Sequence, residues 1–578
     1  MERGGNKPYH TVINAENFHA LQTLLYTHEG KLDAIYIDPP YNTGAKDWKY
    51  NNDYVEADDS YRHSKWLAMM ERRLKLAKRL LNPENSVLIV TIDEKEYLRL
   101  GLLLEQIFIE AKVEMVSSVI NPKGTGRSGD FARTNEFLFF IRLGTATVSG
   151  RTDDSSVGTE VAWETMRRRN LASKRGRRGK GACGPNQFYP IYVSETTGAI
   201  VGRGDPLPAD TPHTNILPPK GTVAVFPIRA DGTEMNWEYT DSAFDKWWSK
   251  GYIRANGKKN EPQPYIIQHL PNKARKEIDS GAVTVDGKRG DGTVIARYVE
   301  ASSKHVTTQW DFTSHSAEHG GTGILKAVLP ERRFPFPKSL YAVEDALRFF
   351  VADKPNSIIL DFFSGSGTTA HAVMRLNKQD GGQRQCISIT NNEVSADEQK
   401  ALRKKGLRPG DAEWEALGIC DYITKPRIRA AITGQTPEDE PIKGDYKFTD
   451  EFPMADGFEE NAEFFTLTYE APRPIAHNKS FSIIAPLLWL KAGARGKRID
   501  KRCDDFAVAD TYAVLFDLDV TAAFIAALAK AKDCRMAFIV TDDDRGFQTV
   551  CGELPPGIEA VRLYESYLTN FTINTGRD

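Results

Sequence analysis

The stretch LDAIYIDPPY, residues 32–41, is the part of the sequence that most strongly predicts a fold class. Its apolar run, Leu32 to Ile37, predicts a short buried strand, and the turn that follows begins at Asp38. Pro39 and Pro40 fix φ and lack an N–H donor, so this turn is rigid. Because ligands of α/β folds bind at the carboxyl ends of strands, the turn is a candidate functional site.

The residues of this turn carry groups that suit one kind of ligand. The Asp38 carboxylate and the Pro39 carbonyl are hydrogen-bond acceptors, Pro40 keeps the turn rigid, and Tyr41 offers a flat ring. Two acceptors beside a stacking ring suit a planar base with an exocyclic amine. The alternative is an ordinary turn that ends a strand, because four-residue motifs recur by chance. The longer run IYIDPPYNTG, at the end of a predicted strand, favours the site.

The residues around this turn predict an α/β domain. Apolar spacing predicts helices over 64–81 and 96–108, and apolar runs predict strands over 86–93 and 137–143. Strands that alternate with helices are typical of a parallel sheet covered on both faces.

A second motif lies in SIILDFFSGSGTTAHAV, residues 357–373, where a strand, a glycine-rich turn and a helix follow one another. Glycines allow a ligand to approach the backbone closely, and a helix N-terminus favours a carboxylate or phosphate. The lysine of a P-loop is missing, which argues against that site. The candidate cofactor-binding residues here are Asp361, Phe363, Ser364, Gly365, Gly367 and Thr368.

Glu393 ends the next predicted strand, at a position where an acidic residue holds ribose hydroxyls in nucleotide-binding folds. A solvated loop carboxylate is an equally good interpretation of Glu393 taken alone.

Composition excludes several classes of protein. The 578 residues include 76 Lys and Arg against 78 Asp and Glu, a net charge of −2, with 40% hydrophobic and 27% charged residues, which is ordinary for a globular chain. No apolar run approaches the roughly 20 residues that span a bilayer. The N-terminus lacks a signal-peptide pattern, and the six cysteines are scattered without metal-ligand spacing. We therefore expect a cytoplasmic protein with neither disulfides nor a metal site.

A basic run between residues 161 and 180 is the clearest candidate for a DNA-binding segment. It holds eight Lys and Arg residues and one Glu, in a chain that is otherwise not basic. Phosphate contact is the functional interpretation, and a solvated loop is the alternative. The candidate DNA-binding residues are Arg167, Arg168, Arg169, Lys174, Arg175, Arg177 and Arg178.

Together the two motifs resemble the amino-methyltransferases that use S-adenosylmethionine, in which DPPY is the catalytic motif and FSGSG the cofactor motif. An Asp at position 38 resembles the adenine-specific group more than the cytosine-specific one. Phe363 follows Asp38 by 325 positions, and this permuted order is similar to the β-class arrangement.

Further segments resemble the modification subunits of Type III restriction systems, over roughly residues 10–435. They are NQFYPIYV (186–193), HGGTGIL (319–325) and FPFPKSLYAVEDALRFF (334–350). This resemblance implies that Lys338 and Ser339 lie near the methionine carboxylate of the cofactor. Where the family commonly has a His-Glu pair, this chain has Asn135-Glu136.

The resemblance implies an α/β fold: a permuted, Rossmann-like S-adenosylmethionine-dependent methyltransferase with an inserted target-recognition domain and a small C-terminal α/β domain. We expect five segments: a catalytic half (1–150), a DNA-binding insertion (151–330), a cofactor-binding half (331–437), an acidic linker (438–463) and a C-terminal domain for docking or dimerisation (464–578).

The implied activity is site-specific methylation of the exocyclic amine of adenine in double-stranded DNA. The implied partners are a restriction subunit and a second copy of the chain. Two alternatives stay open: a catalytically silent DNA-recognition subunit, and a methyltransferase that acts on the cytosine amine. The order of the motifs also requires that the 38–41 turn and the 363–367 loop, although distant in sequence, meet in one crevice.

Overall fold

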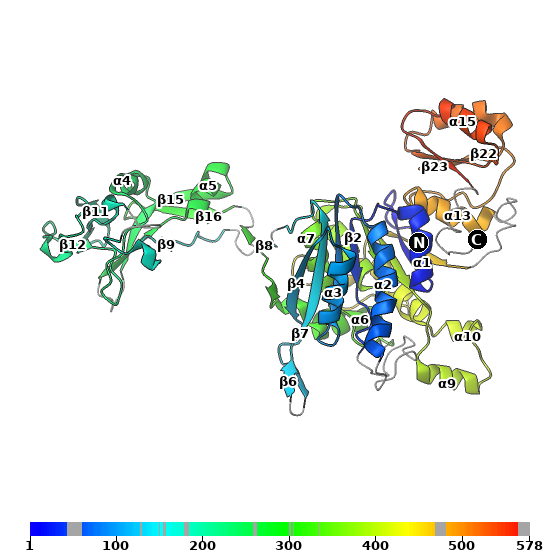
Figure 1. Ribbon diagram of the computed structural model, residues 1–578, viewed down its shortest axis with the longest axis horizontal. Helices are drawn as coiled ribbons and strands as arrows, with labels where there is room; N and C mark the ends of the chain where they lie inside the picture. Colours follow the sequence, from blue (N-terminus) through cyan, green and yellow to red (C-terminus); the bar gives the residue numbers. More distant parts are fainter. Residues whose placement is uncertain are drawn as a thin grey trace. The chain divides into compact units, whose positions relative to one another are not determined.

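The computed structural model describes residues 1–42, 61–127, 130–149, 151–153, 158–177, 184–257, 263–299, 302–304, 306–332, 334–468 and 481–563. The chain forms two compact units (Figure 1). Unit 1 comprises Met1–Ser149 and Val306–Asp578, and unit 2 comprises Gly150–His305.

Unit 1 is built on a nine-stranded sheet in the order β18-β4-β7-β3-β2-β19-β20-β1-β21. The strands are β1 (Tyr9–Asn14), β2 (Ala34–Ile37), β3 (Asn85–Ile92), β4 (Lys112–Val119), β7 (Asn135–Gly144), β18 (Gln309–Trp310), β19 (Ile358–Asp361), β20 (Gln385–Thr390) and β21 (Asn461–Thr466). The predicted α/β fold is confirmed, and the strands expected beside both motifs are β2, β3, β7 and β19.

The expectation of an all-parallel sheet was wrong for β7, which runs antiparallel to both β3 and β4. β4 reaches β7 through a short hairpin, β5 (Thr125–Arg127) and β6 (Asp130–Arg133), rather than through a helix. A hairpin reverses the chain direction, whereas a parallel connection needs a crossover of a dozen or more residues.

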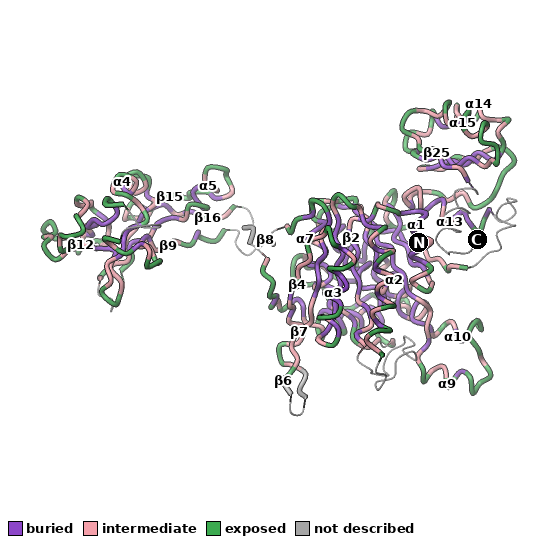
Figure 2. Tube along the Cα trace, in the orientation of Figure 1, coloured by how far each residue is buried: buried purple, intermediate pink, exposed green. Residues whose placement is uncertain are grey.

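Helices cover both faces of this sheet, and buried residues concentrate in the sheet and on the helix sides that face it (Figure 2). One face carries α1 (Asn17–His28), α2 (Arg62–Leu80) and α3 (Tyr97–Ile107), and the other carries α6 (Ile324–Val328), α7 (Leu340–Val351), α8 (Thr368–Asp380) and α11 (Lys425–Thr433). In α2 the buried residues Trp66, Met70, Leu74 and Ala77 recur at helical spacing, which gives the helix one apolar side.

Unit 2 contains small antiparallel sheets around a separate core. The strands are β8 (Arg151–Asp153), β9 (Glu164–Thr165), β10 (Ile191–Ser194), β11 (Ile200–Arg203), β12 (Thr222–Val225), β13 (Ile253–Gly257), β14 (Tyr265–His269), β15 (Val283–Lys288), β16 (Val294–Tyr298) and β17 (Ser302–Lys304), with helices α4 (Asp241–Ser249) and α5 (Asn272–Ser280). Trp237 is buried in this core, where its indole N–H donates to the Tyr189 carbonyl at 2.9 Å.

The expected end of the insertion at residue 330 was about 25 residues too late. Unit 2 ends at His305, and residues 306–330 belong to unit 1. There β18 pairs with β4, and Ile324 and Val328 of α6 are buried in the core. Gly320 and Gly321 form part of a π-helix, Ala317–Gly323, that packs against residues 337–339 of unit 1.

The expectation that residues 438–463 form a linker was also wrong, because this segment packs on the core. Ile442, Tyr446 and Phe458 are buried there, and β21 begins at Asn461. The many acidic residues drew attention away from these apolar side chains. Burial of one large apolar side chain is favourable by roughly 1.5–3 kcal/mol.

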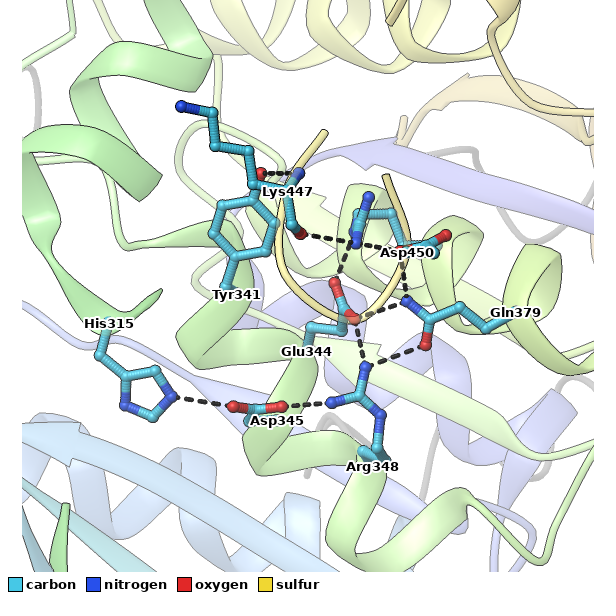
Figure 3. A network of polar contacts seen from close by, with 9 residues as sticks. His315, Tyr341, Glu344, Asp345, Arg348, Gln379, Lys447 and Asp450 are labelled. Carbon is cyan, nitrogen blue, oxygen red and sulfur yellow. Dashed lines mark hydrogen bonds and ion pairs between the residues drawn. The ribbon is translucent and has the colours of Figure 1, made fainter. Parts of the chain in front are cut away.

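Polar contacts also attach this segment to the core. The Arg375 guanidinium of α8 has no exposed surface and pairs with Glu344 of α7 and with Asp450. Figure 3 shows Glu344, Gln379 and Asp450 converging, and the Gln379 amide donates to Asp450 at 2.9 Å. The acidic side chains here therefore include fixed partners of buried cations.

The C-terminal region forms the predicted small α/β layer. Its sheet has the order β22 (Phe506–Val508), β23 (Tyr512–Leu515), β24 (Met536–Ile539) and β25 (Glu559–Arg562), with helices α13 (Phe481–Lys491), α14 (Thr521–Leu528) and α15 (Asp544–Glu553). It is grouped with unit 1 rather than standing as a separate unit. Trp489 of α13 meets Tyr9 edge-on at 5.1 Å, and the Lys491 ammonium donates to the Tyr26 carbonyl.

An acidic residue that follows β24 caps the next helix. The Asp543 carboxylate accepts from the N–H groups of Arg545 and Gly546 and so caps α15. Within the described residues, no group of three or more His, Cys, Asp or Glu side chains is placed to hold a metal ion. In the part of the chain that the structure covers, the helices are too short or too polar to span a membrane.

We expect Arg375→Ala to lower the free energy of unfolding by about 3–5 kcal/mol, because Glu344 and Asp450 would lose a buried countercharge. Urea denaturation of the full chain measures this loss. Lys400→Ala is the control, since its pair with Asp397 is exposed and contributes at most about 1 kcal/mol. Equal effects of the two substitutions would contradict the structural role of Arg375.

Candidate active site

The two motifs leave the same edge of the sheet on neighbouring strands. β2 and β19 run parallel, with Ala34 opposite Ile359 and Ile35 opposite Leu360. The turn at Asp38 and the glycine loop therefore lie side by side. They share an open pocket of about 450 Å³, whose lining includes Tyr36, Asp38, Lys338, Asp361, Phe363, Ser364, Gly365 and Thr368.

The Asp38 carboxylate is held in place at the edge of this pocket. Its Oδ1 accepts from the Thr91 hydroxyl at 2.6 Å and lies 3.3 Å from the Lys338 ammonium. Burial raises the pKa of Asp38 and the Glu136 charge adds to this, while Lys338 and Thr91 oppose the rise. The carboxylate is therefore an aimed acceptor whose charge depends on its neighbours.

Hydrogen bonds also fix the rest of the turn. The Pro40 carbonyl accepts from the Trp66 indole N–H at 2.7 Å, and Pro39 is buried. The Tyr41 ring is 8% exposed, and its hydroxyl donates to Glu136 at 3.3 Å. The Lys338 ammonium lies 4.6 Å from the centre of the Tyr41 ring and donates to the Tyr41 hydroxyl, so it lies at the hydroxyl end of the ring that sequence reasoning assigned to base stacking.

Lys338 lies at the centre of this cluster. Its Nζ donates to Glu136 Oε2 at 2.5 Å and to the Tyr41 hydroxyl, besides its contact with Asp38. Burial alone would lower the pKa of Lys338, but Asp38 and Glu136 raise it above its ordinary value. The ammonium is therefore charged, and carboxylates flank it on two sides.

The backbone that carries Lys338 is tightly packed. The Ser339 hydroxyl is buried and donates to the Ser314 carbonyl at 2.8 Å. A Cβ on Gly320 would lie 2.1 Å from Ser339 Oγ, and one on Gly321 would lie 2.2 Å from the Pro337 carbonyl. The HGGTG run therefore lets a π-helix approach the segment 337–339.

The glycine loop is shaped by a buried carboxylate and by its glycines. Asp361 accepts from the Phe363 N–H at 3.0 Å and from the Thr369 hydroxyl at 2.5 Å. Burial, with a contribution from the Asp38 charge, raises the pKa of Asp361 to about 7. Gly367 has φ +79°, and a Cβ there would come within 3.3 Å of Thr424, so a larger residue would be strained.

The loop also carries an unused polar group. Ser364 Oγ is buried and finds no hydrogen-bond partner among the described residues, although it lines the pocket. Behind the loop, the Arg427 guanidinium donates to the hydroxyls of Ser366 and Thr368 at 2.9 and 2.8 Å. The loop is thus braced from inside, while one hydroxyl on its pocket side is left for a ligand.

Sequence reasoning missed several residues of the site. Thr91, Trp66 and Arg427 belong to no motif and are found only through their contacts. Glu136 could have been found, because it starts β7 at the place where the family pair was sought. Glu393 lies outside the pocket lining, half-buried after β20, and accepts from the Asn391 amide at 3.2 Å.

The cations of the basic run in unit 2 divide into those that contact other residues of the protein and those that are exposed. Arg175 stacks 3.8 Å from the centre of the Phe188 ring and pairs with Glu234 at 2.9 Å, and the side chains of Arg167 and Arg168 donate to the carbonyls of Ile228 and Glu238. Arg169, Lys174 and Arg177 are exposed. Arg178 lies outside the described residues.

The raised pKa of Asp361 predicts a pH dependence of stability. Its folded pKa, about 7, lies above the ordinary Asp value of 3.8, so between these two pH values the folded protein holds a proton that the unfolded chain has lost. Raising the pH from 5 to 8 should therefore remove about 2.5 kcal/mol of stability that Asp361→Asn does not lose. Urea midpoints of both proteins across this range measure the difference. A wild-type midpoint that stays level with that of Asp361→Asn, or rises relative to it, as the pH increases would contradict the prediction.

Comparison with known proteins places these features in a family. The family model described as DNA methylase matches residues 32–401, more than half of the chain. The Type II methyltransferase M.KpnI of Klebsiella pneumoniae is 27% identical over 390 residues, which span 66% of this chain and 80% of that protein. The Type III restriction-modification enzyme EcoPI Mod subunit of Escherichia phage P1 is 26% identical over 66% of this chain, and the match spans only 57% of the Mod subunit.

Among solved structures, the M1.HpyAVI–SAM complex matches 69% of this chain and 99% of its own, with 14% identity and a TM-score of 0.27. The family match starts at the strand before Asp38, runs through the loop of Gly365 and Gly367, and ends beyond Glu393. On this evidence, the chain belongs to the DNA methylase family.

Proposed function

We propose that this protein transfers a methyl group from S-adenosylmethionine to the exocyclic amine of adenine in double-stranded DNA. The observation that carries the proposal is the shared pocket, in which the Asp38 turn faces the Gly365 loop from a neighbouring parallel strand. The site thus offers an amine acceptor beside a backbone cradle that a ligand can approach.

Asp38 and the Pro39 carbonyl perform the central task in this mechanism. The lone pair of an adenine amine is delocalised into the ring, so the amine is a poor nucleophile. Two acceptors on its N–H groups hold the nitrogen in place and direct the lone pair away from the ring. Orientation supplies much of the rate enhancement, and the Asp38 charge stabilises the positive charge that develops on nitrogen. Since the target base cannot reach the pocket inside a duplex, it must be flipped out.

The residues present fit the cofactor that the family resemblance implies. Ser364 Oγ is buried at the pocket wall without a partner among the described residues, and Gly365, which has no Cβ, lines the same pocket. Asp361, Phe363, Ser364, Gly365, Gly367 and Thr368 would hold the cofactor, with Glu393 near its ribose and Lys338 and Ser339 near its carboxylate. When bound, S-adenosylmethionine supplies an activated methyl group on its sulfonium.

Adenine is the proposed base because an Asp opens the catalytic motif, which the resemblance associates with adenine methylation. The cytosine amine is the alternative target, and base analysis of the methylated product distinguishes the two. A catalytically silent recognition subunit is disfavoured because the acceptor Asp38 and the glycine loop are both intact and adjacent.

The proposal extends to the setting of the reaction. The likeness to the EcoPI Mod subunit supports a restriction-modification role in the cytoplasm, with a restriction subunit as partner and a second copy of the chain. Co-purification with a co-expressed Type III restriction subunit and light scattering of the purified chain test these two partners. Methylome sequencing of a host that expresses the protein identifies both the modified base and the recognised sequence.

Asp38→Ala should lower kcat for methyl transfer by about 1000-fold, because the amine loses its charged acceptor. Transfer of tritium from labelled cofactor to DNA measures the rate. The control is Asp397→Ala, which removes an almost fully exposed carboxylate and should leave the rate unchanged. Normal methylation by the Asp38 variant would refute the assigned role.

Unit 2 is the proposed DNA-reading part of the chain. Its exposed cations, rather than those already paired within the protein, are the candidates for phosphate contact. Replacement of Arg169, Lys174 and Arg177 by Ala should weaken DNA binding and reduce the salt dependence by about one unit per lost contact.

Arg175→Ala is the matched substitution in the same run. It should lower the stability of unit 2, because Arg175 is paired with Glu234 and stacked on Phe188. Titrations of DNA at several salt concentrations, together with thermal unfolding, measure both effects. An unchanged salt slope in the triple variant would contradict the assignment.

A further inference from the structure

The Lys338 ammonium occupies the place that the proposed function gives to the substrate amine. Its Nζ lies 3.3 Å from Asp38 Oδ1 and 4.6 Å from the centre of the Tyr41 ring. An ammonium and an amine are both N–H donors, and both are attracted to this carboxylate oxygen. The two groups therefore compete for the same acceptor.

Only the side chain of Lys338 is free to leave this position. The backbone of residues 337–339 is packed against Gly320 and Gly321, and the Ser339 hydroxyl is tied to Ser314. The lysine side chain, in contrast, is a flexible four-carbon stem with a compact charge at its end. A small rotation of that stem suffices to move the ammonium off Asp38.

Glu136 provides the position to which the ammonium can move. Its Oε2 already accepts from Lys338 at 2.5 Å, and its side chain is 12% exposed. Leaving a largely buried ammonium without a partner is strongly unfavourable, so Lys338 can give up Asp38 only if another carboxylate holds it. The other charged and titratable groups of the described residues near this cluster include Arg133 of β6, Asp361 at the end of β19, Asp93, His315, Glu318, and the hydroxyls of Tyr36 and Tyr41.

We propose that Lys338 holds the place of the substrate amine on Asp38 and moves onto Glu136 when the flipped base enters. Glu136 is then a positioning residue that makes Asp38 available to the amine. This inference rests on the proposed function. It also accounts for the buried charge of Asp38 before substrate arrives, because the ammonium keeps the carboxylate ionised, with the proton on Lys338.

The test compares the full-length protein with Glu136→Gln, Lys338→Met and the double variant. The first readout needs no cofactor. It is the ratio of the dissociation constants for duplexes that carry purine, which lacks the amine, or adenine at the target position. In Glu136→Gln the ammonium has no other carboxylate, so the preference for adenine over purine should fall by at least about tenfold. The double variant lacks the competing ammonium and should recover the wild-type ratio.

The second readout is single-turnover methylation across pH. Glu136→Gln should be about 100-fold slower than the wild type, and the double variant should be at least about tenfold faster than Glu136→Gln. Lys338→Met leaves Asp38 beside Glu136 without a cation, so Asp38 should bind a proton and the activity should rise as the pH increases. Asp397→Asn, which neutralises an almost fully exposed carboxylate, is the control and should behave as the wild type.

Two results would overturn the proposal. If the losses of the two single variants multiply in the double variant, Lys338 and Glu136 do not act through one another. If Lys338→Met instead weakens only cofactor binding and Glu136→Gln is close to the wild type, the lysine serves the cofactor carboxylate. Absence of methylation by the wild-type protein would refute the proposed function itself, while the purine-to-adenine ratio would still test the exchange.

Discussion

The parallel pairing of β2 with β19 is the constraint on which the site depends. Neighbouring strands of a sheet lie about 4.8 Å apart, and parallel strands end at the same edge. The Asp38 turn and the Gly365 loop are therefore brought together by backbone hydrogen bonds, although more than 300 residues separate them in the sequence. The insertion of unit 2 leaves this pairing intact, because the chain leaves the sheet after β7 and returns at the edge strand β18.

Charge is the second constraint on the pocket. Asp38 and Asp361 bring carboxylates to its walls, Glu136 lies behind Lys338, and burial raises the pKa of the first two. A cluster of this kind favours ligands that carry or develop positive charge, such as a sulfonium or an amine under attack. Lys338 supplies a countercharge within the cluster. The ammonium is therefore both a stabiliser of the free protein and a competitor of the substrate.

Sequence reasoning succeeded where a local pattern reports directly on local structure. The apolar runs before Asp38 and Asp361 are buried strands, and the apolar spacing around Met70 and Leu74 is an amphipathic helix. It failed where composition was taken as a guide to packing. The acidic segment around Asp450 buries Tyr446 and Phe458, and the glycines near Gly320 allow close packing rather than a free loop. Among the candidate DNA-binding cations, Arg175 is largely engaged within the protein.

The amino-acid sequence by itself determined the α/β class, the two motifs and the order in which they occur, because each depends on residues that are close together along the chain. The tertiary structure alone decided what surrounds Asp38. Thr91, Glu136 and Lys338 come from three separate segments and meet only when β3, β7 and the chain before α7 are assembled around β2. Distances between such side chains depend on the packing of the whole sheet, and no local pattern encodes them.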